Sequence, residues 1–252
     1  MALKHWAMEV RAQYLLLPVV LSLVGGALAY HDGSFDALTF GMFTAVLVLL
    51  HVTVNTLNDY YDDVYGIDRA QTMRSPFNGG TGMIQAGLVS RRQVLAMAIG
   101  TAVLGFMIGM YLVATVSWAL LPVLLLGMGF ALFYTQLFAR NMLGEVSAGL
   151  GLGVLPVLGA YLVQTVSLSS GAVVLASAAG LLTFNLLLLN EFPDMEADRI
   201  GGRRNLVLSL GTGRAAWLYV LANGAVYGIL LLFALLGEIP ALARDLEAAV
   251  EP

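Results

Sequence analysis

Residues 38–57 read LTFGMFTAVLVLLHVTVNTL, and residues 58–68 continue directly with NDYYDDVYGID. The first stretch has one His and no formal charge, and it is long enough to cross the hydrocarbon layer of a membrane as a helix. The second stretch places four aspartates at the end of that helix. An apolar span that ends in an acidic cluster therefore decides the fold class and the kind of site to expect.

The rest of the chain has the same apolar character. Of its 252 residues, 59% are apolar and 11% are charged, whereas soluble domains have roughly 25% charged residues. Lipid offers no hydrogen-bond partner to the backbone, so each long apolar run is expected to be a helix. The predicted fold is all-α, a polytopic transmembrane bundle with seven spans, at about 14–30, 38–57, 94–113, 117–138, 143–164, 172–190 and 215–236.

Composition also excludes several classes of function. The chain has no cysteine, which rules out disulfides and thiolate metal sites, and its three dispersed histidines are expected to be structural. A net charge of -4 makes a nucleic-acid partner unexpected. Residues 1–11 carry charges and precede an apolar run without a small-residue cleavage site, so they predict an amphipathic lead-in rather than a cleaved signal peptide.

The basic residues predict how the chain lies in the membrane. If the N-terminus is cytoplasmic, eleven of the twelve Lys and Arg residues fall on the cytoplasmic side, and only Arg244 does not. This is the positive-inside pattern. We therefore expect an integral, multi-pass membrane protein whose N-terminus and acidic clusters are cytoplasmic.

The two acidic clusters share a helical spacing. Asn58 and Asp62 stand one turn apart, and Gly66 is expected to end their helix so that Asp68 folds back. In the second cluster Asp194 and Asp198 also stand one turn apart, and Pro193 is expected to open a new helical turn before them. Each cluster thus presents an acidic face at the cytoplasmic end of a span.

Like charges packed together at a membrane surface need a compensating cation. Oxygen ligands without His or Cys favour Mg²⁺, which fills its shell with water and substrate phosphate. Two facing clusters suggest a diphosphate bridged by two ions. The alternative is that these carboxylates are solvated loop residues, which occur at many helix ends.

These segments resemble the UbiA superfamily of intramembrane prenyltransferases. The run from Asn58 to Asp62 with Gly66 and Asp68 is similar to the first aspartate motif of the menaquinone-type branch, and residues 194–198 are similar to the second. Further similarity lies at Arg11 and in the segment that contains Tyr134, Thr135, Arg140, Gly144 and Glu145. Ala12 and Pro193 depart from the pattern, since the family usually has Pro and Arg at these positions.

The resemblance implies a helical bundle around a central cavity that transfers a polyprenyl group from an isoprenyl diphosphate to an aromatic quinone precursor. It implies that two Mg²⁺ ions are held by Asn58, Asp62, Asp194 and Asp198, with Asp68 close by. The catalytic residues would be Asp62, Asp68, Asp194 and Asp198. Substrate would be bound by Arg11, Arg74, Tyr134, Arg140 and Arg203, with Tyr134 stabilising an allylic carbocation through its ring.

The family usually has nine helices, whereas the sequence predicts seven. We therefore expect residues 1–252 to form a single UbiA-like domain without counterparts of the last two helices, followed by an acidic, polar tail at 238–252.

Other functions stay open at this point. Within the family, the acceptor could be a non-quinone lipid or ring compound, and some members cyclise the isoprenoid without an acceptor. Outside it, the alternatives are a cation-coupled transporter and a non-catalytic partner subunit, and a homo-oligomer is compatible with any of them. The sequence does not fix the acceptor or the chain length of the donor.

Overall fold

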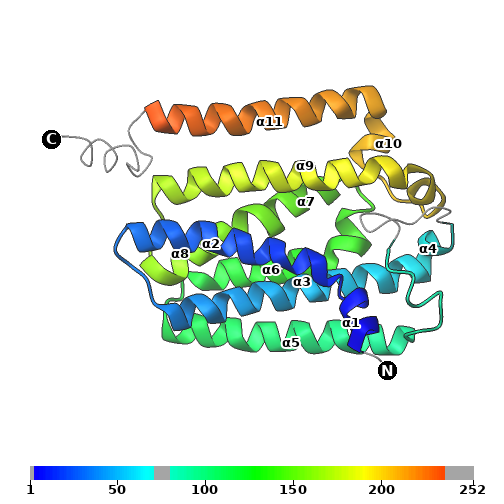
Figure 1. Ribbon diagram of the computed structural model, residues 1–252, viewed down its shortest axis with the longest axis horizontal. Coiled ribbons are helices and arrows are strands. Elements are labelled where there is room, and N and C mark those ends of the chain that lie inside the picture. Colours follow the sequence, from blue (N-terminus) through cyan, green and yellow to red (C-terminus); the bar gives the residue numbers. More distant parts are fainter. Residues whose placement is uncertain (1–2, 71–79, 236–252) are drawn as a thin grey trace.

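The computed structural model describes residues 3–70 and 80–235, and this part of the chain is helical, without strands. Long helices lie side by side along one direction (Figure 1). Seven helices in the described ranges are long and apolar enough to cross a membrane. They are α2 with its preceding 3₁₀ turn η1 (Ala12–Leu15 and Leu16–His31), α3 (Ala37–Tyr65), α5 (Arg91–Thr115), α6 with the π-helical η2 (Leu120–Phe133 and Tyr134–Phe138), the chain of α7, π-helical η3 and α8 (Gly144–Ala148, Gly149–Val154 and Leu155–Thr165), α9 (Ser170–Ile200) and α11 (Thr212–Leu235).

The prediction of an all-α bundle with seven long apolar helices is confirmed. Three short helices join them at one end of the bundle: α1 (Leu3–Glu9), α4 (Ile67–Ala70) and α10 (Leu206–Leu210). The largest differences from the predicted ranges are at the ends of α3 and α9, which continue as helix through both acidic clusters. The predicted acidic tail at 238–252 lies outside the described residues.

Local signals explain where the long helices begin and end. The Asp36 carboxylate accepts a 2.8 Å hydrogen bond from the Thr39 N–H at the start of α3, which lowers the pKa of Asp36. Ser90 and Gln93 form a capping box at the start of α5. Gly66 ends α3 with a φ of 79°, as predicted, and the chain turns there into α4.

Pro193 does not open a new helix, contrary to the sequence-based expectation. It lies inside α9, which runs without a break from Ser170 to Ile200. The proline removes one backbone donor, but the helix continues on both sides of it. Asn190, Asp194 and Asp198 therefore stand on one face at successive turns, and all three line the same cavity.

Close backbone contacts hold the inner helices together. A Cβ placed on Gly25 in α2 would lie 2.2 Å from the Val157 carbonyl oxygen of α8, and one on Gly153 in η3 would lie 2.6 Å from the Cα of Gly180 in α9. Only glycine allows these approaches. On one side α9 packs against η3 and α8, and on the other it packs against α11, which runs along the outer edge of the bundle in Figure 1.

Candidate functional site

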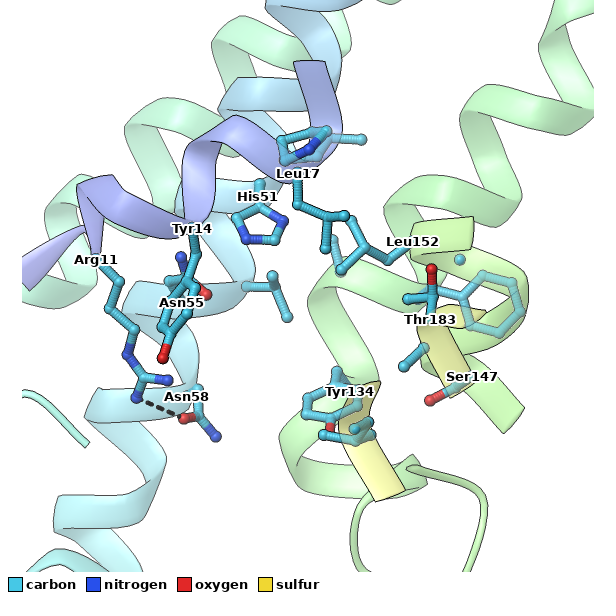
Figure 2. Close-up of a pocket in the computed structure, with 18 of the residues that line it drawn as sticks. Arg11, Tyr14, Leu17, His51, Asn55, Asn58, Tyr134, Ser147, Leu152 and Thr183 are labelled. Atoms are coloured by element: carbon cyan, nitrogen blue, oxygen red, sulfur yellow. Dashed lines mark hydrogen bonds between the residues drawn. The ribbon is translucent and has the colours of Figure 1, made fainter. Parts of the chain in front are cut away.

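A cavity of about 1190 Å³ runs into the bundle from the end at which α3 and α9 carry their acidic residues. Most of its wall is apolar and comes from α2, α3, α6, η3, α8 and α9. Figure 2 shows Arg11, Asn55 and Asn58 on one wall and Tyr134, Ser147 and Thr183 on the other. The space can therefore take a long apolar molecule that has a charged head.

The two acidic clusters meet at Arg203, which follows α9. Its Nη2 donates to Asp62 Oδ1 at 2.5 Å, and its Nη1 donates to Asp198 Oδ1 at 3.2 Å. Asn205 Nδ2 donates to the other oxygen of Asp198 at 2.9 Å. Burial alone would lower the pKa of Arg203, but the charges of Asp62 and Asp198 outweigh it and raise the pKa above its ordinary value. A permanently cationic guanidinium thus joins α3 to the end of α9.

Arg11 forms a second junction on the α3 side. Its Nη2 donates to Asn58 Oδ1 at 3.0 Å, the bond drawn in Figure 2, and it also pairs with the buried carboxylate of Asp59. Burial opposes the charge, but Asp59 raises the pKa of Arg11. Its backbone has a φ of 52°, a left-handed conformation that is uncommon outside glycine and is often found at functional sites.

Asp68 folds back towards the cavity, as predicted. Gln85 Nε2 donates to Asp68 Oδ2 and to Asp63 Oδ1, both at 3.2 Å, and Arg91 pairs with Asp63. Gly80 lies so close to Asp68 that a Cβ there would be 2.4 Å from Oδ1. Gly80 and Gln85 therefore hold Asp68 and the end of α3 at the rim of the cavity.

Most of the predicted site residues line this one cavity. They are Arg11, Asn58, Asp62, Asp68, Tyr134, Asp194, Asp198 and Arg203. Arg140 does not line it, because its guanidinium lies over the ring of Tyr65, 4.4 Å from the centroid. Arg74 lies outside the described residues. The roles assigned to these residues stay predictions.

The candidate metal ligands are chemically suited to a hard cation such as Mg²⁺. Asn58, Asp62, Asp194 and Asp198 offer oxygen ligands to the same cavity, without sulfur. As the side chains stand in residues 3–70 and 80–235, no three acidic or His groups are close enough together to hold a metal ion. Asp62 and Asp198 instead bind Arg203, so metal binding requires that at least some of these side chains reorient.

Sequence reasoning gave no site role to three polar groups in the wall of the cavity or directly behind it, although Glu145 belongs to the segment that resembles the family. His51 lines the cavity with a buried Nδ1 that has no hydrogen-bond partner among the described residues. Glu191 lines it as well, and Glu145 is fully buried beside it. An ionisable residue within or next to an apolar span was the available signal, since such residues are usually functional.

Comparisons with known proteins identify the family and agree with the fold. The family described as UbiA prenyltransferase family matches residues 18–243. The 1,4-dihydroxy-2-naphthoate octaprenyltransferase of Escherichia coli is 30% identical over 215 residues, 82% of this chain and 68% of that protein. The enzyme of the same name from Bacillus subtilis is 26% identical over 208 residues, 81% of this chain and 65% of its own length. The chain thus spans about two thirds of the length of these relatives.

A solved structure extends the comparison to the fold. The UbiA homolog from Archaeoglobus fulgidus bound to GPP and Mg²⁺ has a TM-score of 0.71 and 14% identity, and the match covers 92% of this chain and 78% of that one. At this identity the likeness shows the fold alone. The matches to the family and to its menaquinone branch confirm the resemblance that the aspartate motifs carry, and the chain belongs to the UbiA prenyltransferase family.

Proposed function

We propose that this protein transfers a polyprenyl group from an isoprenyl diphosphate to an aromatic quinone precursor within the membrane. The observation that carries the proposal is the single cavity in which an apolar wall ends at both acidic clusters and two arginines. The family supports the reaction class, and the names of the relatives from Escherichia coli and Bacillus subtilis support a naphthoate acceptor of the kind used in menaquinone biosynthesis.

The charged end of the cavity is suited to a diphosphate. Arg11 and Arg203 present guanidinium groups there, whose planar donors fit paired phosphate oxygens. Asn58, Asp62, Asp194 and Asp198 would hold Mg²⁺, the ion in the Archaeoglobus complex, with Asp68 nearby. When bound, Mg²⁺ supplies positive charge to the departing diphosphate, and two ions are the number we propose.

The apolar part of the cavity is suited to the prenyl chain. Tyr134 lines it at the start of η2, beneath the charged end, and Figure 2 shows its side chain across from Asn58. An aromatic face stabilises an allylic cation without forming a bond to it. The surrounding wall excludes water, which would otherwise capture the cation.

Membrane embedding is part of the proposal. Seven helices long and apolar enough to cross a membrane support a cavity within the bilayer, where lipophilic donors and acceptors would be dissolved. The distribution of basic residues supports a cytoplasmic N-terminus and a cytoplasmic opening for the diphosphate.

The proposal is tested by product formation from purified protein with a radiolabelled isoprenyl diphosphate, Mg²⁺ and a panel of aromatic acceptors. We expect Asp62→Asn and Asp194→Asn to lower prenyl transfer by about 100-fold or more, because each removes one charge that holds the cation at the leaving group. Chelation by EDTA should have the same effect. Glu196→Gln, on α9 but 75% exposed in its side chain, is the matched control and should keep wild-type activity.

Each contrary outcome identifies an alternative. Diphosphate release without any acceptor, with a cyclic isoprenoid as product, would replace the proposal with a terpene cyclase. Transfer only to a glycerol phosphate or a porphyrin-type acceptor would replace the acceptor class. No release from folded protein with any donor would exclude the enzyme and favour a transporter or a partner subunit.

A further inference from the structure

A polar ring interrupts the apolar wall of the cavity at His51, in the middle of α3. His51 is 6% exposed, and its Nδ1 is buried without a hydrogen-bond partner in the part of the chain that the structure describes. Figure 2 shows the ring on the same wall as Arg11 and Asn55, where it reaches towards the cavity. The mechanism described so far does not use this side chain.

The unpaired nitrogen of His51 points to a bound molecule. Buried polar atoms in folded proteins almost always have a hydrogen-bond partner, and each exception needs an explanation. An apolar side chain such as Leu would fill the same place in the wall without an unpaired group. Because His51 lines the cavity, a molecule that enters the cavity can supply the missing partner.

His51 shares a face of α3 with the polar residues of the charged end. Asn55, Asn58 and Asp62 follow it at intervals of four, seven and eleven residues, which repeat one face of a helix. All four side chains line the cavity. His51 stands two turns before Asn58, about 10 Å along the helix axis. This face therefore carries one polar group from the charged end into the apolar part of the cavity.

The chemistry of the two proposed substrates identifies the partner. An isoprenyl chain has no polar atom beyond its diphosphate, so a donor whose diphosphate lies at Asn58 and Asp62 has nothing to offer to His51. An aromatic quinone precursor carries hydroxyl groups on its ring. A hydroxyl group both donates and accepts hydrogen bonds, so it can pair with Nδ1 whichever nitrogen of the imidazole carries the proton.

We propose that His51 binds a ring hydroxyl group of the aromatic acceptor and so determines which acceptors the cavity takes. The inference rests on the proposed prenyl transfer. The acceptor ring then lies deeper in the bundle than the diphosphate, with its hydroxyl group against α3. This contact favours a hydroxylated ring over an apolar ring of the same shape, because the apolar ring leaves Nδ1 unpaired.

Acceptor binding is measured without donor, with two fluorescent probes that differ by one hydroxyl group, 4-hydroxy-2-naphthoate and 2-naphthoate. We expect His51→Leu to weaken binding of 4-hydroxy-2-naphthoate by about tenfold, the size of one hydrogen bond, and to leave the Kd for 2-naphthoate unchanged. His51→Gln keeps a donor and an acceptor, so it should restore most of the difference. His31→Leu is the matched control, since His31 is 53% exposed in its side chain and ends α2 at the far end of the bundle.

Two further measurements separate acceptor binding from a structural role. Because Nδ1 has no hydrogen bond to lose, His51→Leu should unfold in detergent at the temperature of wild type or above it. In the transfer assay, we expect His51→Leu to raise the KM for the aromatic acceptor by about tenfold, while the Kd for the isoprenyl diphosphate stays within about threefold of wild type.

The outcomes distinguish this inference from the function on which it rests. If wild-type protein transfers prenyl groups but does not distinguish the two probes, or if His51→Leu binds both as wild type does, the hydroxyl contact is wrong and the proposed function stands. If His51→Leu weakens both probes equally or lowers the unfolding temperature, His51 only shapes the wall, and the inference is also wrong. If wild-type protein transfers to no aromatic acceptor, both proposals fail.

Discussion

At the residue scale, Thr81 forms a partly buried polar contact between α1 and the cavity rim. Thr81 Oγ1 lies 2.5 Å from Asp59 Oδ2 and 3.0 Å from Glu9 Oε2. Glu9 is fully buried, and its Oε1 has no partner among the described residues. The hydroxyl of Thr81 donates towards both carboxyl groups and has one proton to share between them, so it compensates the burial of Glu9 only in part.

Burial, together with the charge of Asp59, raises the pKa of Glu9 from 4.5 to about 7. Because the folded-state pKa is the higher one, the contribution of Glu9 to the free energy of unfolding is greatest below pH 4.5, falls as the pH rises from 4.5 to 7, and stays low above pH 7. The full loss is about 3 kcal/mol if α1 stays docked. Thermal unfolding in detergent between pH 5.5 and 8.5 should show this loss for wild type and a flatter profile for Glu9→Gln, with Glu196→Gln as control. Identical profiles for wild type and Glu9→Gln would contradict the prediction.

From the sequence it was possible to predict which helix faces carry the site residues, but not which side chains contact one another across helices. Helical spacing was enough to place Asn58 and Asp62 on one cavity wall and Asp194 and Asp198 on another, since these relations depend only on the local backbone. It could not show that Arg203 joins the two walls, because that contact links residues 141 positions apart.

At the element scale, the π-helical segment η3 brings α7 and α8 against α9. Cβ atoms on Gly149 and Gly153 would lie within 2.9 Å of Gly180 backbone atoms, so the two segments touch main chain to main chain. The π-helical turn of η3 depends on contact with the partner helix, so it could not be predicted from the sequence. The uninterrupted course of α9 through Pro193 could not be predicted either, because tertiary packing overrides the local preference of proline.

Gly153→Ala should therefore be strongly destabilising. Its added methyl group would lie 2.6 Å from the Gly180 Cα, so η3 and α9 must move apart and expose the cavity wall that they share. We expect a loss of about 1–3 kcal/mol, the usual cost of overpacking, seen as a lower unfolding temperature in detergent. Gly228→Ala, in α11 with no atom near its Cβ position, is the matched control and should be neutral. Equal stability of the two variants would show that the helix contact is not tight.

At the scale of the whole molecule, the predicted orientation can be tested because the chain has no cysteine. Ala86→Cys lies in the exposed loop before α5, and Ser167→Cys lies in the exposed connection between α8 and α9, at the opposite end of the bundle. If the N-terminus is cytoplasmic, a membrane-impermeant maleimide should label Ser167→Cys in intact cells and Ala86→Cys only after the membrane is opened. The reverse pattern would invert the topology and place the charged end of the cavity outside.

The length of the cavity should limit the length of the donor. The wall follows α6 and η2 from Tyr134 near the charged end to Leu120, a span of roughly 21 Å along the helix. Val123→Trp fills the apolar end of this space, so we expect it to exclude long isoprenyl diphosphates while dimethylallyl diphosphate binds as in wild type. Leu125→Trp, on the outward side of α6 and 52% exposed, is the control and should keep the donor range of wild type.

The measurement is the Kd of each variant for a series of isoprenyl diphosphates of increasing chain length. If Val123→Trp also fails to bind the shortest donor, the substitution distorts the charged end of the cavity. If it still binds the longest donor, the prenyl chain leaves the cavity before reaching α6, and the prediction is wrong.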